Sequence, residues 1–312
     1  PKPRPRKVFQ IIVKYRASQE NFWKTARFEK TIENLPEYQQ ENAAMSKNVA
    51  AKLNCIRDLS YGNDNVQMLD IFPPTVNPAP ILVDIHGGGW RAGSKNARSF
   101  PAQAVTQAGI MWVPIDYGLA PDYSIDQIVD HVRTALVWIY RHGSEFGGDP
   151  NNIFVSGNSA GGHLTGCTLM PGWHSDYGAP DNLIKGACAI SGIYDLQALV
   201  HAEYGYNNEL AMDLNTAFRY SPLFHLPSKG CPLLISYGAP EPNEFRRQSR
   251  SFYEAWKKCG FPATEIIVEG AHHFSMSRQL SNSDSFLFKS LMPILLALLF
   301  SSSSLNTNLA CI

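Results

Sequence analysis

The sequence predicts an α/β fold: a mostly parallel central sheet with helices on both faces. Short apolar runs rich in β-forming residues alternate with longer segments of helical spacing, which is typical of parallel sheets covered on both sides. No internal repeat or long linker interrupts this alternation. At 312 residues, with 44% hydrophobic and 17% charged residues, the chain can bury a large core in the manner of an ordinary globular protein.

Seven apolar runs are the candidate strands. They span residues 66–72, 80–87, 110–117, 152–157, 186–192, 232–238 and 264–270. The clearest candidate helix is residues 124–143, where apolar residues recur on one face at helical spacing: Ile125, Ile128, Val129, Val132, Leu136 and Ile139. Residues 244–258 have similar helical spacing, so strands and helices alternate along the chain.

Both ends of the chain differ from this pattern. We expect an N-terminal helical arm at residues 1–54, one α/β domain at residues 55–300 and a disordered tail at residues 301–312. The apolar run at residues 291–300 is too short to span a bilayer and contains a proline, which favours a terminal helix packed on the core. The basic N-terminus is followed by no segment of signal-peptide length, which favours a cytoplasmic location.

Charge and cysteine content narrow the choice of partners. Lys+Arg and Asp+Glu both total 27, so the formal net charge is zero and favours neither nucleic acid nor an anionic membrane. The six cysteines show no CxxC pair or metal-ligand spacing, so we expect no metal site and no disulfide framework. Small-molecule substrates remain, and a homodimer is compatible with the sequence.

The first chemical motif is Gly157-Asn158-Ser159-Ala160-Gly161. It follows the apolar run at residues 152–157 and precedes a helix-like segment. A strand, Gly-x-Ser-x-Gly and a helix form a strained turn that lifts the serine hydroxyl above the edge of the sheet. The start of a helix also favours a developing oxyanion. Ser159 is therefore a candidate nucleophile, although a glycine-rich turn that merely caps a helix has the same pattern.

The second motif is His86-Gly87-Gly88-Gly89-Trp90, which follows the run at residues 80–87. In the α/β-hydrolase fold, a glycine loop at this place supplies backbone N–H groups to the oxyanion hole. The absence of side chains lets these groups approach the substrate oxygen. We expect the N–H groups of Gly88, Gly89 and Ala160 to be the donors, with His86 as a structural histidine.

A serine nucleophile needs a histidine base and a carboxylate, and the α/β-hydrolase order is serine, acid, histidine. His272 and His273 follow the last predicted strand, where the base belongs, and the sequence alone leaves both as candidates.

The acid is expected after the run at residues 232–238. Asp195 comes one strand too early, and Glu244 opens a helical segment, where an acid commonly serves the helix dipole. Glu241 lies in the loop, between Pro240 and Pro242, which restrict the backbone around it. We therefore expect Glu241 to be the acid.

Seven motifs together resemble the kynurenine formamidase (arylformamidase) branch of the α/β-hydrolases, which is related to hormone-sensitive-lipase-like esterases. They are HGGGW, DYGLAP, GGDPNNIFVSGNSAGGHL, SGIYDL, YSPL, EPNEFRRQS and GAHHF, in order over most of residues 55–275. The resemblance selects His273 as the base, agrees with Glu241 as the acid, and makes residues 55–300 a catalytic domain. The EPNEFRRQS element is the more specific one, because lipase-like relatives usually carry an Asp-Pro-Leu acid loop there.

The resemblance implies a serine hydrolase that converts N-formyl-L-kynurenine to formate and L-kynurenine in tryptophan degradation, without a metal or cofactor. Trp90 could wall off the acyl pocket, and Tyr204 or Tyr206 could stack on the aminophenyl ring, although ordinary packing accounts for each of these aromatic residues equally well. Two alternatives remain: a carboxylesterase for short acyl or aryl esters, since a fold does not fix a substrate, and a hydrolase-fold binding protein that has lost catalysis.

Overall fold

The centre of the molecule is one eight-stranded sheet. The computed structural model describes residues 35–74, 76–200 and 207–303, with side chains as far as residue 296. The strand order is β1-β2-β4-β3-β5-β6-β7-β8, and every pair from β4 to β8 is parallel, whereas β1 and β2 run antiparallel. The strands are β1 (Ile56–Ser60), β2 (Met68–Ile71), β3 (Ala79–Ile85), β4 (Met111–Ile115), β5 (Gly148–Asn158), β6 (Ile184–Ile190), β7 (Leu233–Gly238) and β8 (Ala263–Val268).

Helices cover both faces of this sheet. The α-helices are α2 (Leu35–Lys52), α3 (Ala102–Gln107), α4 (Ile125–His142), α5 (Ala160–Thr168), α6 (Asn207–Leu210), α7 (Leu214–Arg219), α8 (Asn243–Lys258) and α9 (Phe286–Ser303). The 3-10 helices are η2 (Lys95–Arg98), η3 (Gly143–Phe146), η4 (His174–Tyr177), η5 (Gln197–Leu199), η6 (Pro222–Phe224) and η7 (Ser275–Ser281).

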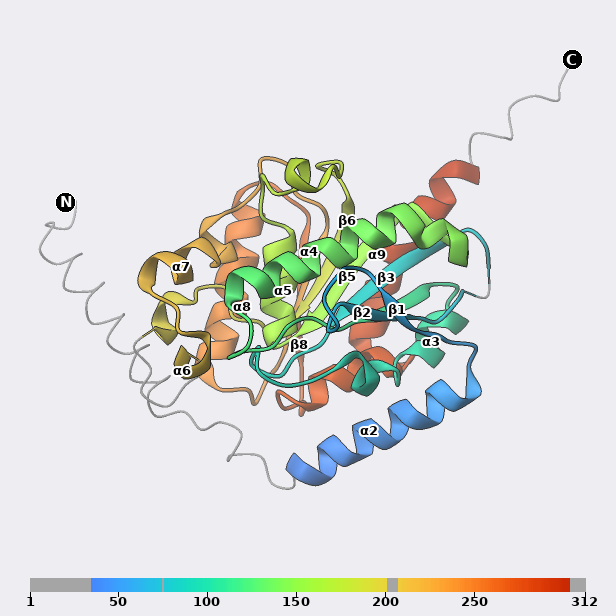
Figure 1. Ribbon diagram of the computed structural model, residues 1–312, viewed down its shortest axis with the longest axis horizontal. Helices are drawn as coiled ribbons and strands as arrows, with labels where there is room; N and C mark the ends of the chain where they lie inside the picture. Colours follow the sequence, from blue (N-terminus) through green and yellow to red (C-terminus); the bar gives the residue numbers. More distant parts are fainter. Residues whose placement is uncertain (1–34, 75, 201–206, 304–312) are drawn as a thin grey trace, which may run out of the picture.

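The two faces of the sheet carry separate hydrophobic cores. Side chains of α4, α5 and α8 belong to one core, and side chains of α3 and α9 to the other. Figure 1 shows α4 crossing in front of the sheet and α9 behind it. Successive strand residues alternate between the cores, as Ile81 and Leu82 on β3 do, because side chains point to opposite faces of a strand. The predicted α/β-hydrolase fold class is thereby confirmed.

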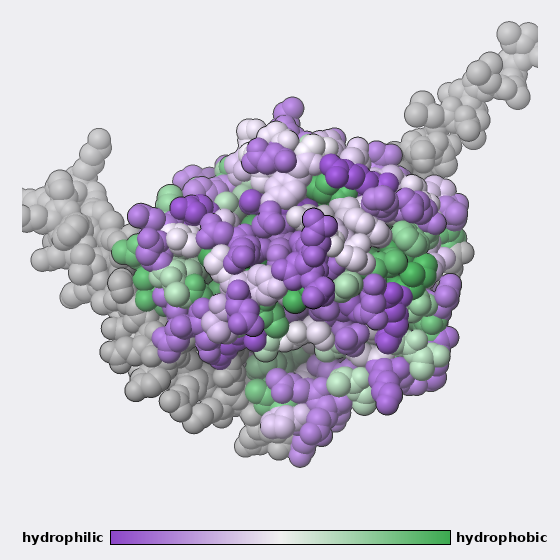
Figure 2. Space-filling view, viewed as in Figure 1, coloured by the Kyte–Doolittle hydropathy of each residue, from purple (hydrophilic) through white to green (hydrophobic). Residues whose placement is uncertain are grey.

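Helix α4 illustrates how the sequence specifies these elements. Ser124 caps its start: its hydroxyl accepts from the Gln127 N–H, and the Gln127 side chain accepts from the Ser124 N–H, a reciprocal capping box. The predicted apolar face is buried on the sheet. The opposite side, which exposes Asp130 and Arg141, falls in a largely hydrophilic region of the surface in Figure 2.

All seven predicted strands are present, and β1 is the strand that the apolar pattern did not predict. Its sequence, IRDLS, lies at the edge of the sheet and is mostly exposed. An edge strand buries little surface, so it needs no apolar run. The pairing of β1 with β2 nevertheless makes this end of the sheet antiparallel.

A helix lies near each end of the described chain. α2 lies along one side of the domain (Figure 1), within the predicted arm, and the rest of the arm at residues 1–34 lies outside the described residues. α9 extends to Ser303 with Pro293 inside it, so its last three residues fall within the predicted tail, and residues 304–312 lie outside the described part. No helix in the described residues is long and apolar enough to cross a membrane.

The parallel strands bring four loops to one edge of the sheet. The glycine loop follows β3, Ser159 follows β5, Glu241 follows β7 and His273 follows β8. Since the carboxyl ends of parallel strands point the same way, segments distant in sequence meet at this edge.

Candidate active site

Ser159 occupies a strained turn between β5 and α5. Its φ and ψ are 59° and −119°, a region that a residue with a side chain rarely adopts. The neighbouring glycines are required by close approach: a Cβ at Gly157 would lie 2.3 Å from the Gly161 carbonyl oxygen, and one at Gly161 would lie 1.9 Å from the Ile85 oxygen. A hydrogen bond of 2.9 Å from the Ser159 N–H to the Ile190 carbonyl fixes the turn against β6.

Ser159, His273 and Glu241 form a continuous chain of hydrogen bonds. His273 Nε2 lies 2.9 Å from Ser159 Oγ, and His273 Nδ1 lies 2.8 Å from Glu241 Oε2. A carboxylate only accepts hydrogen bonds, so Nδ1 carries the proton and Nε2 is left to accept the serine proton. Both the histidine and the glutamate are buried, at 3% exposure each, which protects the chain from competing water.

The other candidate base and acids have different partners. His272 turns toward α2, where its ring meets that of Tyr38 edge-on at 5.2 Å. Glu244 lies in the first turn of α8 and pairs with Arg247, three residues further along the same helix. Asp195 accepts from the backbone N–H of Gln197.

The glycine loop has a geometry suited to oxyanion donors. His86 Nδ1 lies 2.8 Å from the Gly87 oxygen, and the Gly88 oxygen accepts from the Ala92 N–H at 3.1 Å. Because the C=O and N–H of a trans peptide point in opposite directions, these contacts direct the Gly88 and Gly89 N–H groups away from His86 and Ala92. Within the described residues, no group accepts from these two N–H groups or from that of Ala160 at the start of α5.

Gly88 and Gly89 are required where they stand. Their φ angles are 122° and 63°, and a Cβ on Gly88 would lie 2.0 Å from the Ala92 oxygen. Burial lowers the pKa of His86 to about 4, so its ring is neutral at pH 7 and donates a single hydrogen bond to the loop. The ring also stacks on Tyr117 at 4.2 Å. His86 therefore supports the loop, as the sequence suggested.

A cavity of about 620 Å³ opens over these groups. Its walls come from the glycine loop, from α2 and from the segment after His273. They include Leu35, Gln39, Asn42, Gly88, Gly89, Arg91, Phe100, Ser159, His273, Phe274 and Ser277. The three residues of α2 recur at helical spacing on one face, so the N-terminal helix forms one wall of the cavity.

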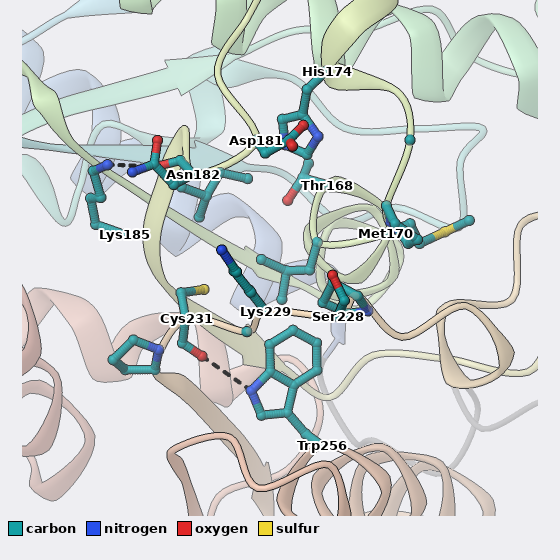
Figure 3. Close-up of a pocket in the computed structure, with 17 residues that line it drawn as sticks. Thr168, Met170, His174, Asp181, Asn182, Lys185, Ser228, Lys229, Cys231 and Trp256 are labelled. Atoms are coloured by element: carbon teal, nitrogen blue, oxygen red, sulfur yellow. Dashed lines mark hydrogen bonds between the residues drawn. The ribbon is translucent and has the colours of Figure 1, made fainter.

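A larger cavity, of about 770 Å³, lies elsewhere (Figure 3). It is lined by residues at the end of α5, before β6 and β7, and by Trp256 of α8. These strands begin here, so this cavity is at the amino ends of the sheet, whereas ligands of open α/β sheets bind at the carboxyl ends. The cavity at Ser159 is therefore the candidate active site.

Comparison with known proteins places this geometry in a family. The BD-FAE family model matches residues 69–256, more than half of the chain. The chain belongs to this family. The kynurenine formamidase of Danio rerio is 31% identical over 248 residues, which cover 77% of this chain and 82% of that protein. Esterase LipQ of Mycobacterium tuberculosis is 27% identical and covers 69% of this chain and 56% of its own.

Solved structures agree with this assignment. A putative thioesterase of Silicibacter sp. TM1040 superposes with a TM-score of 0.73 at 27% identity, covering 83% of this chain and 94% of that one. An esterase of Pyrobaculum calidifontis gives a TM-score of 0.70 at 18% identity, over 84% and 92% of the two chains, which shows the shared fold. The protein is a serine hydrolase in the branch that holds the kynurenine formamidases and related esterases.

Of the three predicted substrate-binding residues of this hydrolase, the structure describes Trp90 alone. Trp90 has no exposed surface, and its indole N–H donates to His163 Nδ1 at 3.1 Å behind the glycine loop. Burial lowers the pKa of His163 to about 4, so its ring is neutral and can accept this bond. Tyr204 and Tyr206 lie outside the described residues.

Several residues at the site carried no sequence signal strong enough to single them out. The α2 wall is one case, because helical spacing in the arm does not say which domain surface the helix will cover. Phe245 is another: it is fully buried, and its ring packs 4.4 Å from the ring of His273. Ser191 is a third, and its hydroxyl donates to Glu241. The sequence predicted a helix at residues 244–258, which contains Phe245, and the SGIYDL motif contains Ser191, but neither pattern indicated what these two residues contact.

Proposed function

We propose that this hydrolase cleaves N-formyl-L-kynurenine to formate and L-kynurenine, with Ser159 as nucleophile, His273 as base and Glu241 as the orienting acid. The observation that carries the choice of substrate is the 31% identity with the kynurenine formamidase of Danio rerio over most of both chains. The hydrogen-bonded Ser159, His273 and Glu241 support the chemistry, because they have the mutual geometry that serine acyl transfer requires.

In the first step, Ser159 Oγ attacks the formyl carbon while its proton passes to His273 Nε2. The carbonyl oxygen becomes an oxyanion, which the N–H groups of Gly88, Gly89 and Ala160 would stabilise. His273 becomes a cation, and the adjacent Glu241 carboxylate stabilises it through Nδ1. The proton then moves from Nε2 to the aniline nitrogen, the C–N bond breaks, and L-kynurenine leaves.

In the second step, water completes the cycle. His273 takes a proton from water as the oxygen attacks the formyl-enzyme, and it returns that proton to Ser159 as formate departs. The anilide leaving group is only weakly basic, so its C–N bond behaves partway between an amide and an activated ester. An esterase-type triad is sufficient for such a bond, and the proposed reaction uses water alone as its second substrate.

The pocket residues are assigned within this proposal. The formyl group needs a small acyl site, which Trp90 would close from behind the glycine loop, and Tyr204 or Tyr206 would stack on the aminophenyl ring. The α2 wall would face the leaving group. Turnover of p-nitrophenyl esters of increasing acyl length tests the small acyl site, and we expect a steep fall beyond acetyl.

A carboxylesterase of short esters is the second candidate, favoured by esterase relatives such as LipQ. Comparing kcat/KM on N-formyl-L-kynurenine and on p-nitrophenyl acetate separates the two, and we expect the formyl anilide to be preferred by roughly tenfold or more. A large preference for the ester would reject the formamidase function and leave the esterase. A fluorophosphonate probe that forms no adduct at Ser159 would instead support the inactive binding protein.

A further inference from the structure

Ser191 lies where the nucleophile and the acid meet. It follows β6, the strand between β5, which leads to Ser159, and β7, which leads to Glu241. The preceding residue, Ile190, accepts a hydrogen bond of 2.9 Å from the Ser159 N–H, and the Ser191 N–H donates to the Ser236 oxygen at 2.8 Å. The backbone at this point is therefore held from both neighbouring strands.

The side chain of Ser191 points to the acid. Its Oγ donates to Glu241 Oε1 at 2.6 Å, and the same oxygen accepts from the Gly238 N–H at 2.8 Å. The other oxygen, Oε2, faces His273 Nδ1. Ser191 is fully buried, and Glu241 is its hydroxyl's hydrogen-bond partner among the described residues. The carboxylate is thus held by three donors that together fix its plane.

The backbone of Ser191 gives a second, independent observation. Its φ is 49°, in the left-handed region that favours glycine and strains a residue with a side chain. Glycine would relieve this strain at no cost to the turn. A strained serine whose hydroxyl contacts a catalytic carboxylate is the pattern expected when the side chain is kept for function.

We propose that Ser191 is a positioning residue, the fourth member of the hydrogen-bonded chain through Ser159, His273 and Glu241. This proposal rests on the hydrolytic function proposed above. A glutamate side chain has one more rotatable bond than an aspartate, so its carboxylate needs more restraint to present one oxygen to the histidine. The Ser191 hydroxyl and the Gly238 N–H supply that restraint on Oε1, and Ser191 transfers no proton itself.

Two substitutions separate the hydroxyl from the backbone strain. Ser191→Ala and Ser191→Gly both remove the hydroxyl, but only glycine relieves the left-handed strain. We expect both variants to lose kcat by the same factor, about 10 to 100, as for a lost hydrogen bond to a charged group, with KM changed less than about twofold. We expect Ser191→Gly to melt about 2 °C or more above Ser191→Ala. Wild-type kcat in Ser191→Gly, or activity that follows Tm, would overturn the proposal.

A double-mutant cycle tests whether Ser191 affects kcat through Glu241. If Ser191 acts through Glu241, adding Ser191→Gly to Glu241→Gln should cost almost nothing further, whereas independent effects would multiply. Multiplying effects would contradict a positioning role. Ala211→Gly is the matched control, because Ala211 also has a φ of 49° but is exposed and bonds to Asn207 instead. We expect it to raise Tm and leave kcat unchanged.

Three assays distinguish a failure of the Ser191 proposal from a failure of the proposed formamidase function. Each variant is measured on N-formyl-L-kynurenine, on p-nitrophenyl acetate and for the rate of fluorophosphonate labelling at Ser159. If the ester is strongly preferred, the formamidase function fails, but the Ser191 effect must still appear in ester turnover and in labelling. If the wild-type protein is not labelled at Ser159, both proposals are overturned.

Discussion

Glu241 and Glu244 are three residues apart and have opposite surroundings. Glu241 is buried and reaches His273 from the loop after β7. Glu244 is also buried, but it belongs to α8 and pairs with Arg247 and Gln248. The difference follows from the position of Pro242, which ends the loop and serves as the N-cap of the helix. The Glu241 carboxylate is thereby directed to His273 and the Glu244 carboxylate to its own helix.

We predict that Glu241→Gln lowers kcat by roughly 10³ to 10⁴, the scale known for loss of a triad carboxylate. In the proposed mechanism His273 becomes charged in the transition state, and a neutral amide cannot stabilise that charge. Glu244→Gln should cost only a small factor, because it removes a helix ion pair away from His273. Steady-state kinetics with circular dichroism as a check on folding measure both, and a larger loss at Glu244 would refute the assignment.

His86 offers a second test at this scale, since it holds the carbonyl behind one proposed oxyanion donor. His86→Ala frees the Gly87 peptide, and we expect kcat to fall about 10- to 100-fold, somewhat less than loss of a donor itself. KM should change little, because the ground-state carbonyl depends less on the donors. The control is His174→Ala, another largely buried histidine, which lines the cavity at the opposite edge of the sheet. Equal losses in the two variants would show a general effect on stability.

At the scale of elements, Arg278 connects α2 to the segment that follows His273. Arg278 of η7 donates to Asn42 Oδ1 at 2.7 Å and to Glu41 at 2.9 Å, and its guanidinium lies 3.5 Å from the centre of the Tyr38 ring. The Tyr38 ring in turn contacts His272, next to His273. Arg278 thus helps to hold α2, which has few buried residues of its own, beside the cavity.

We predict that Arg278→Ala raises KM several-fold with a smaller effect on kcat. Loss of the cation–π contact and of the hydrogen bonds, together worth about 2 kcal/mol or more, loosens the wall that α2 gives the cavity. Limited proteolysis should cut α2 faster in the variant. Arg250→Ala, which removes an exposed arginine paired with Glu254 on α8, is the matched control and should change neither. An unchanged KM in Arg278→Ala would show that α2 does not shape the site.

Most helices and strands could be predicted from local sequence patterns, because the burial and the turn contacts that select their residues are visible within each segment. The β3 and β5 runs are apolar because the strands are buried on both faces, and the glycines around Ser159 are required by contacts within the turn. The edge strand β1 and the α2 wall could not be predicted in this way. β1 is a mostly exposed edge strand that is placed by its pairing with the nearby β2, and α2 is placed by Arg278, which is far away in the sequence.

The candidate site likewise contains residues that local sequence predicted and residues that only tertiary contacts reveal. Sequence order and spacing led to Ser159, to Glu241 and to the pair His272 and His273, and the structure places His273 in hydrogen-bond contact with the other two. The choice between His272 and His273 needed the family resemblance, because two adjacent histidines have the same spacing and differ only in direction. Ser191 was missed for a related reason: a serine that follows a strand gives no sign of a left-handed φ or of the carboxylate that it will meet.

At the scale of the whole molecule, buried histidines connect the active site to acid stability. His86 supports the glycine loop, and His163 links Trp90 to the Tyr220 carbonyl, with Nε2 at 2.7 Å from that oxygen. Burial lowers the pKa of both to about 4, against about 6.5 in an unfolded chain. Each ring therefore stays neutral in the folded state while its unfolded counterpart takes up a proton below pH 6.5.

The sign of the effect follows directly. Where the unfolded state binds more protons, the free energy of unfolding falls as the pH falls, so stability present above pH 6.5 is lost between about pH 6.5 and 4. Each of the two histidines contributes on the order of 3 kcal/mol over that range. Burial also lowers the pKa values of His131 and His174, which act in the same direction.

We therefore predict that His163→Asn reduces the slope of unfolding free energy against pH by up to about 1.4 kcal/mol per unit, the value for one proton. Urea unfolding at several pH values between 6.5 and 4 measures it. Both proteins share every other titrating group, so the difference isolates His163. Cys167→Ala is the control, because the Cys167 sulfur lies 3.3 Å from His163 Nε2 and its loss removes packing without removing the imidazole. Cys167→Ala should lower stability at every pH and keep the wild-type slope. An unchanged slope in His163→Asn would contradict the prediction, because it would mean that the His163 ring is already protonated in the folded state.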